Sequence, residues 1–577
     1  MSKLARRFAA VLLAALLVSG CAVRAYAAEH GTVDYQDMVY ERYDTERFYE
    51  KQAEVKRLLE ENGSKEELLA AYNGLVSEIS DLETLYVLCQ NSYYRDVNNS
   101  WYREESEWMY ECVNTIYDEF LQTVSLILNS EYGEVLLEQE GEELSLYTDY
   151  EAMTQEEMDL AMKEQQLTAE YDQALLSEEE DRYDRIGDIF TALVGVRTEM
   201  AEYYGYDNYA DYSYEIIYSR DYSTEDAAYL YSYVKAYIVP VYVSLMMKFD
   251  SSVFEALESF SYGGEEALLD LLEPYMGRIS EKLSEAYSYM RQYHLYDWDV
   301  DAKKMSIGYT TYLPSYHAPF TFNASDGSFY DVTTMIHEFG HYNEFYQNGQ
   351  TKYYQIDSID VSEVHSQALE LLFLAYYPEI FPEITDEVTL YTMYAILSGI
   401  VDGCLYDEFQ YEVYTNPQMS AQEITDLYRE LAEEYGMELY GSLAYQWMEI
   451  PHTFHQPMYY ISYAVSAAAA LEIWEVSLDD RQAGIDIYLD FVELGCNTGI
   501  RTALLDCGLK NVLLEDTIRE IAESTAEYLG LDVEYGEWEE EERGGLLSET
   551  SETFLRIFVI AAVLLALYGI RLNRRYR

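Results

Sequence analysis

Two of the eight histidines in this 577-residue chain lie four residues apart, in the segment His337-Glu338-Phe339-Gly340-His341. Residues at positions i and i+4 of a helix share one face, so both imidazoles could reach a single metal ion. Such a pair binds Zn²⁺ together with a third protein ligand and a water whose pKa falls to about 7, and the glutamate can face that water. The same residues could also be surface side chains of an amphipathic helix. The spacing therefore indicates a site for zinc-assisted hydrolysis without establishing it.

A second acidic segment, Ser362-Glu363-Val364-His365-Ser366-Gln367-Ala368-Leu369-Glu370, follows about one helix length later. Its polar residues at i, i+3, i+4 and i+7 share one helical face; they are Glu363, Ser366, Gln367 and Glu370. A helix of this kind, packed against the first, could supply one carboxylate to the metal and another to a hydrogen bond that orients a ligand. The spacing does not choose between Glu363 and Glu370 as the third ligand.

Three blocks of the sequence carry a resemblance to a known family. They read GYTTYLPSYHAPFTFNASDGSFYDVTTMIHEFGH over residues 308–341, SEVHSQALELL over residues 362–372, and PHTFHQPMYYISYAVSAAAALEIW over residues 451–474. In this order they resemble the active-site region of the oligoendopeptidase F and thimet oligopeptidase family of zinc metallopeptidases, and most of all its bacterial oligoendopeptidase F-like members. A weaker similarity extends to LGCNTGIRTALLDCGL near residue 500.

The resemblance implies the metal ligands and the catalytic groups. The ligands of one zinc ion per chain would be His337, His341 and Glu363. Glu338 would take a proton from the metal-bound water and pass it to the leaving amine. His452 and Tyr463 match the segment from which this family stabilises the transition state, where one such donor is worth about 2.7 to 4 kcal/mol.

Other residues of these blocks have weaker claims to a role. Ser366 and Glu370 could orient a ligand through hydrogen bonds. Tyr459 and Tyr460 could contact substrate or fill the core, since the chain has 63 tyrosines. Three further histidines are not interpreted as ligands: His365 and His317 could pack or support a ligand through a hydrogen bond, and His455 is interpreted as a neighbouring residue.

The segment from Lys304 to Phe322 alternates β-branched and aromatic residues before Pro314 and again after Pro319, which predicts a β-hairpin. An edge strand beside the metal could pair with the backbone of a peptide substrate, so that main-chain hydrogen bonds hold the peptide. Gly308 and Tyr309 lie where such a strand would approach the substrate. An ordinary two-stranded excursion in a helical protein is the alternative interpretation.

The length, the placement of prolines and capping residues, and the composition predict a mainly α protein. The first proline is Pro240, and capping-box patterns precede apolar helical periods at Ser64–Glu67 and Thr154–Glu157. With the resemblance, this predicts an elongated, two-lobed helical body with a deep substrate channel and a small hairpin or sheet beside the metal. The predicted divisions are a signal peptide (1–27), an N-terminal helical lobe (28–200), a catalytic lobe (201–531), an acidic linker (532–553), a transmembrane helix (554–572) and a basic tail (573–577).

Both ends of the chain indicate export and membrane attachment. Basic residues precede the apolar run 8–18, which is typical of a secretory signal, and cleavage could follow Ala27 or, in a lipobox-like pattern, leave Cys21 acylated. Residues 554–572 are mostly apolar, just long enough to span a bilayer, and are followed by three arginines. We therefore expect an extracytoplasmic, single-pass bacterial membrane protein, with a buried hydrophobic helix as the alternative for 554–572.

Charge excludes one class of partner. The chain carries 107 acidic and 36 basic residues, a net charge of −71, which would repel the phosphates of nucleic acid. The acidic surface could steer basic peptides, but a merely solvated surface is the favoured interpretation. After removal of the signal five cysteines remain, and no disulfide pairing is assigned.

The sequence thus predicts a zinc metalloendopeptidase that cleaves short unfolded oligopeptides outside the cytoplasm. One alternative is a helical metallocarboxypeptidase that shares the histidine motif. The other is an inactive peptide-binding surface protein, which would have to explain why Glu338 is retained. Oligomeric state and peptide preference do not follow from the sequence.

Overall fold

The computed structural model describes residues 30–150, 154–177, 179, 181–350, 352–353, 357–437 and 441–535. These residues form two compact units. Unit 1 takes its residues from the stretches before 155, from 262 to 357 and from 495 to 497, and unit 2 takes the remainder. The predicted mainly helical class with a small sheet is confirmed. The predicted lobe boundary after residue 200 lies inside α7 (Arg182–Tyr203).

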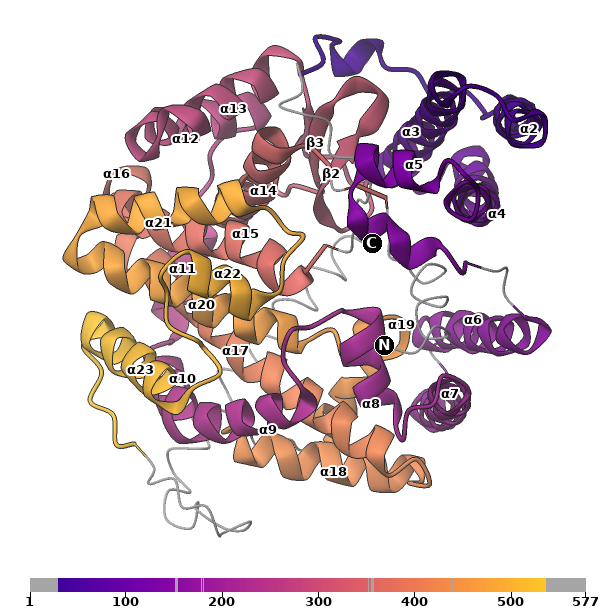
Figure 1. Ribbon diagram of the computed structural model, residues 1–577. Coiled ribbons are helices and arrows are strands. Elements are labelled where there is room, and N and C mark those ends of the chain that lie inside the picture. Colours follow the sequence, from indigo (N-terminus) through magenta and orange to yellow (C-terminus); the bar gives the residue numbers. More distant parts are fainter. Residues whose placement is uncertain are drawn as a thin grey trace. The chain divides into compact units, whose positions relative to one another are not determined.

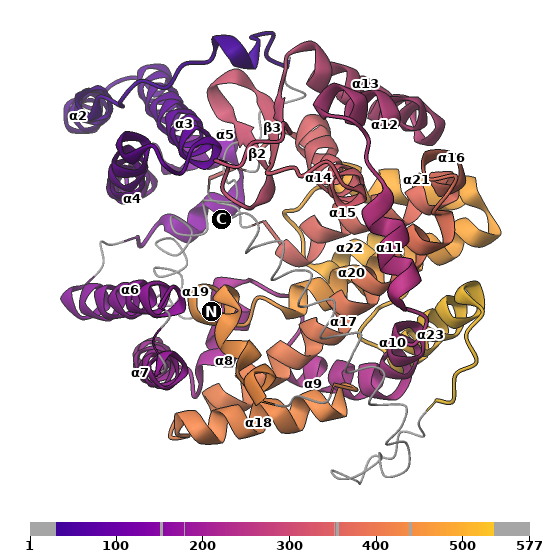
Figure 2. The same ribbon diagram turned by 180° about the vertical axis from the view of Figure 1, so that it is seen from behind.

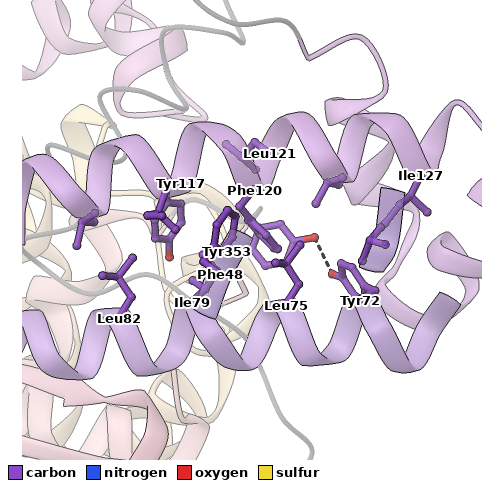
Figure 3. Packing of buried hydrophobic residues seen from close by; sticks show 14 of the residues in the cluster. Phe48, Tyr72, Leu75, Ile79, Leu82, Tyr117, Phe120, Leu121, Ile127 and Tyr353 are labelled. Carbon is purple, nitrogen blue, oxygen red and sulfur yellow. Dashed lines mark hydrogen bonds between the residues drawn. The ribbon is translucent and has the colours of Figure 1, made fainter. Parts of the chain in front are cut away.

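Unit 1 begins with a packed group of long helices, α2 (Thr45–Glu61), α3 (Lys65–Arg95) and α4 (Ser100–Leu128). Ser64 and Glu67 form the predicted capping box at the start of α3, each side chain bonding the other's backbone N–H. Buried side chains between α3 and α4 surround Tyr353, whose hydroxyl lies 2.7 Å from that of Tyr72 (Figure 3). An apolar stripe at helical spacing therefore makes the core here.

The rest of unit 1 contains the sheet. Its remaining elements are η2 (Tyr35–Asp37), α5 (Gly133–Glu140), η3 (Glu142–Tyr147), α12 (Glu265–Ile279), α13 (Glu281–Gln292), β1 (Tyr296–Asp297), β2 (Gly308–Leu313), η6 (Pro314–Tyr316), β3 (Ala318–Asn323) and α14 (Phe329–Asn348). The strand order is β1-β3-β2, with β1 parallel and β2 antiparallel to β3. The predicted hairpin is therefore confirmed, and β2 is an edge strand of this sheet. Helix α14 packs against β2 and β3 (Figure 2).

A buried lysine fixes the hairpin to β1. The Lys304 ammonium is fully buried and forms ion pairs with Asp297 and Asp299. It also donates to the carbonyl of Asp299 at 2.9 Å and to that of Asn323, the last residue of β3, at 3.2 Å. Because a buried charge is stable only when paired and hydrogen-bonded, this arrangement ties the end of β3 to the residues at and after the end of β1.

Unit 2 is helical. Its elements are α6 (Gln155–Leu175), α7, α8 (Tyr209–Tyr212), a π-helical segment (Ser213–Ile217), α9 (Thr224–Tyr233), a second π-helical segment (Val234–Ile238), α10 (Val239–Met246), α11 (Ser251–Ser259), α15 (Ile359–Phe373), η7 (Leu374–Tyr376), α16 (Tyr377–Ile380), α17 (Thr385–Thr415), α18 (Ala421–Glu434), η8 (Gly441–Glu449), α19 (Pro451–His455), α20 (Ile461–Asp479), α21 (Arg481–Leu494), α22 (Ile500–Asp506) and α23 (Glu515–Leu529). Helix α6 begins directly after Thr154, where the sequence predicts a helix start.

Helix α20 lies at the centre of unit 2 and packs against α15, α17 and α21 (Figure 1). Close packing with α17 depends on Gly403, because a Cβ there would lie 2.8 Å from both the Ala464 Cβ and the Tyr460 carbonyl oxygen. By length and composition α17 and α20 could each cross a membrane, and in the structure 56% and 72% of their most apolar stretches are buried. Their hydropathy is that of helices packed into a core.

Candidate metal and catalytic site

Helix α14 carries the two histidines on one face. The ring centroids of His337 and His341 are 5.1 Å apart, a spacing at which both imidazoles can reach one ion. The helix is anchored to the sheet by Asp331, whose buried carboxylate accepts from the backbone N–H of Gly327 at 2.7 Å and from Asn323 Nδ2 at 3.0 Å. These bonds fix the first turn of α14 beside the end of β3.

The Glu338 carboxylate is buried against β2. Thr310 Oγ1 donates to Glu338 Oε2 at 2.8 Å and lies 3.0 Å from the Glu338 carbonyl oxygen. Gly308 is also close, because a Cβ at this position would lie 3.5 Å from Glu338 Oε1 and 3.1 Å from Asn323 Oδ1. The hairpin thus sets the direction in which this carboxylate points.

Thr310 is a site residue that sequence reasoning missed. Alternate residues of a strand face the same side, so Thr310 shares a face with Gly308, which the sequence predicts to lie near the substrate. The alternation of residues along the predicted strand could therefore have indicated Thr310.

Tyr309 is held on the other face of β2. Its hydroxyl donates to Asn91 of α3, and its ring stacks on Phe322 with a centroid distance of 5.3 Å. Burial, with smaller effects from neighbouring tyrosines and acids, raises the pKa of the Tyr309 phenol well above its usual value. The hydroxyl is therefore engaged within unit 1, and contact of Tyr309 with substrate stays a prediction.

Helix α15 carries Glu363. Ser366 Oγ donates to Glu363 Oε2 at 3.2 Å and to its carbonyl oxygen at 2.9 Å, and its role in orienting a metal ligand stays a prediction. Glu370 lies two turns further along α15, and its orienting role stays a prediction. His365 is fully buried, with Nε2 3.2 Å from the carbonyl oxygen of Phe491 in α21, which agrees with a packing role.

The residues around the start of α20 form an aromatic cluster. The ring of His452 lies 5.3 Å from those of Tyr459 and Tyr460 and 6.4 Å from that of Tyr463. The rings of Tyr459 and Tyr463 are 5.2 Å apart. His455, by contrast, has Nε2 2.8 Å from Asp172 Oδ1 in α6. The cluster thus brings together the four site residues predicted in this segment, which are His452, Tyr459, Tyr460 and Tyr463.

The electrostatics of the cluster favour uncharged donors. Burial and the neighbouring His455 lower the pKa of His452 to about 4, against the opposing charge of Glu363. Burial, followed by the effects of Tyr463 and Glu363, raises the pKa of Tyr459 well above its usual value. Near neutral pH the imidazole of His452 is therefore neutral and the Tyr459 phenol is protonated, so both retain a proton to donate.

The predicted site residues fall in both compact units. His337, Glu338 and His341 are in unit 1, and Glu363 follows the crossing into unit 2 between Asp357 and Ser358. The donor atoms in each unit are of the kind that binds zinc. Unit 1 provides two imidazoles on one helical face, and unit 2 provides a carboxylate that accepts a hydrogen bond from a hydroxyl. The complete set of three ligands stays a prediction.

Comparison of the sequence with known proteins finds similarity to an oligopeptidase. No protein-family model matches the chain. A 179-residue stretch is 28% identical to oligopeptidase PepF of Bacillus subtilis (strain 168), covering 29% of this chain and 26% of PepF. This match spans about a quarter of that relative's length.

Two solved structures are similar over most of the chain. A protein described as an oligoendopeptidase F from Bacillus anthracis str. Ames is 21% identical, covers 87% of this chain and 98% of its own, and has a TM-score of 0.71. PZ peptidase A, solved with an inhibitor, is 20% identical, covers 86% and 99%, and has a TM-score of 0.70. The chain therefore has the fold seen in these peptidases. Its predicted resemblance to the oligoendopeptidase F family is confirmed.

Proposed function

We propose that this protein is a zinc-dependent endopeptidase that hydrolyses internal bonds of short, unfolded peptides. The observation that carries the proposal is the environment of Glu338, which lies between two histidines of metal-ligand spacing and has its carboxylate oriented by Thr310 at 2.8 Å. A glutamate held in this way can act as a general base. The fold and the similarity to PepF support a peptidase.

His337, His341 and Glu363 would hold the metal, which when bound supplies Lewis acidity and lowers the pKa of water. Glu338 would accept a proton from the attacking water and deliver it to the leaving amine. His452 and Tyr463 would donate hydrogen bonds to the oxygen of the scissile carbonyl as negative charge develops on it, and Tyr459 lies against the same rings.

The edge strand supports a peptide substrate. Strand β2 pairs with β3 along one side, so within this sheet its other side can accept an extended chain. Main-chain hydrogen bonds of this kind hold a peptide of varied sequence but require it to be unfolded.

The proposal includes a location. Residues 1–27 and 554–572 have the sequence character of an export signal and a membrane span, and both lie outside the described residues. We infer that the catalytic body is extracytoplasmic and tethered by the C-terminal helix.

Cleavage of a peptide blocked at both ends tests the activity. The purified full chain, loaded with one equivalent of zinc, should cut an N-acetylated, C-amidated decapeptide at an internal bond, as seen by mass spectrometry, and a chelator should abolish this. Cleavage of only the unblocked peptide, one residue at a time, would indicate the carboxypeptidase alternative. Binding of both peptides without cleavage would indicate an inactive binding protein.

A further inference from the structure

The turn that precedes the tyrosines of the cluster is held in an unfavourable backbone conformation. Met458 is fully buried and has a φ of 63°, in the left-handed region that non-glycine residues rarely adopt. Such a conformation persists when surrounding contacts over-determine it, and it occurs preferentially at functional sites. The next residue is Tyr459, so this turn decides where the aromatic cluster begins.

Side chains from α17 and from the loop that follows the first π-helical segment hold the turn. Gln410 Oε1 accepts from the Met458 N–H at 3.0 Å, and Arg220 Nη2 donates to the Met458 carbonyl oxygen at 2.9 Å. The Tyr218 hydroxyl donates to the carbonyl oxygen of Pro457 at 2.9 Å. Both polar backbone groups of Met458 are thus bonded to side chains rather than to regular secondary structure.

Arg220 does more than hold this turn. Its side chain is 1% exposed, and its Nη2 also donates to Ser462 Oγ at 3.0 Å, in the first turn of α20. Its Nε lies 3.7 Å from Asp360 Oδ1, in the first turn of α15. The guanidinium carbon lies over the rings of Tyr214 and Tyr218, at 4.3 and 4.4 Å.

One guanidinium therefore connects three segments that carry site residues. Asp360 precedes Glu363 by three residues, about one turn of α15. Ser462 directly precedes Tyr463, and Met458 directly precedes Tyr459. Because these groups all lie in unit 2, a shift of Arg220 would change the placement of the tyrosines relative to Glu363.

We propose that Arg220 is a positioning residue that sets the placement of Tyr463, the proposed oxyanion donor, and of its neighbour Tyr459 relative to Glu363. This inference rests on the proposed peptidase function. Arginine suits this place because its Nη2 bonds both the Met458 carbonyl and Ser462, while the planar group lies over the rings of Tyr214 and Tyr218 with Nε facing Asp360. A lysine offers a compact point charge and cannot reproduce this geometry.

The test is a double-mutant cycle in the full chain with Arg220→Lys and Tyr463→Phe, measured on the blocked decapeptide. Arg220→Lys should lower kcat about 10- to 100-fold, as expected for a small misplacement of catalytic groups, with KM changed less than about threefold and zinc still bound at one equivalent. In the Tyr463→Phe background the same substitution should lower kcat less than about twofold, because the group that it positions has already lost its hydroxyl.

Tyr218→Phe is a second, nearly isosteric probe that keeps the ring but removes the hydroxyl that bonds Pro457. It should lower kcat several-fold in the wild-type background and hardly at all with Tyr463→Phe. Additive effects of Arg220→Lys and Tyr463→Phe, loss of zinc in Arg220→Lys, or an unchanged kcat would overturn the proposal. If Arg220→Lys does not fold, an unchanged kcat in Tyr218→Phe overturns it as well. A wild-type chain that cleaves no blocked peptide would instead overturn the proposed function.

Discussion

Glu338 shows how a carboxylate between two candidate metal ligands is held in one orientation. Its carboxylate is buried, and it is oriented by the hydroxyl of Thr310 from a different element. The motif predicted the glutamate from five consecutive residues, because the spacing itself carries the chemistry. Thr310 is 28 residues away in sequence, and only the folded hairpin brings it to Glu338.

Replacing Thr310 with valine keeps the shape of the side chain but removes this hydrogen bond. A hydrogen bond to a charged group is worth about 1.5 to 3 kcal/mol, so kcat/KM should fall about 10-fold or more while zinc content is unchanged. Thr310→Ser, which keeps the hydroxyl, is the matched control and should retain most activity. Steady-state kinetics on the blocked decapeptide measure this, and equal rates for the valine and wild-type proteins would contradict the assigned role.

Ser366 allows a similar prediction for metal binding. Its hydroxyl contacts the Glu363 carboxylate at 3.2 Å, and loss of a group that orients a ligand costs about 10- to 100-fold in metal affinity. Ser366→Ala should therefore weaken zinc binding by about this factor in competition with a chelator. Ser362→Ala, one residue before Glu363 on the same helix, is the control and should bind zinc as the wild type does. Unchanged affinity in Ser366→Ala would show that Glu363 needs no such support.

At the scale of elements, the features that depend on residues close in sequence were predicted, and those that depend on long-range contacts were not. The alternation around Pro314 predicted the β2–β3 hairpin, and the Ser64 pattern predicted the capping box, because both depend on neighbours in sequence. The turn at Met458 could not be predicted, since its conformation depends on Gln410 of α17 and on Arg220 of a loop, both distant in sequence. The two π-helical segments were not predicted either, because no local sequence pattern indicates them.

The pair of helices α3 and α4 contains a titratable group with a clear effect on stability. Burial raises the pKa of Glu83 in α3 to about 8, partly offset by a hydrogen bond from Tyr117 in α4. A carboxyl group whose pKa is higher in the folded than in the unfolded state contributes stability that is complete below the unfolded pKa and is lost as pH rises through the folded one.

Between about pH 4.5 and pH 8 the wild type should therefore lose stability relative to Glu83→Gln, by up to about 1.4 kcal/mol per pH unit. The glutamine mimics the protonated acid and should remove this pH dependence. Urea unfolding of both proteins at several pH values measures the difference. Parallel stability curves would show that Glu83 is not held in its protonated form.

At the scale of the whole molecule, composition predicted the helical class correctly, and three sequence blocks predicted the family resemblance that the fold now confirms. The division into units was harder to foresee, because unit 1 combines separate stretches of chain whose contacts are long-range. Export and membrane attachment rest on residues 1–27 and 554–572 and stay predictions. The net charge of −71 is interpreted as that of a solvated acidic surface.

Glu338→Gln tests the central claim most directly, with zinc content and cleavage of the blocked decapeptide measured on the same full-length samples. The amide keeps the shape of the side chain and can still accept a hydrogen bond from Thr310, but it cannot take a proton from water. We predict one equivalent of zinc in both proteins and a kcat lower by about 100-fold or more in the variant. A wild-type protein without zinc, or a variant that cleaves as fast as the wild type, would contradict the account.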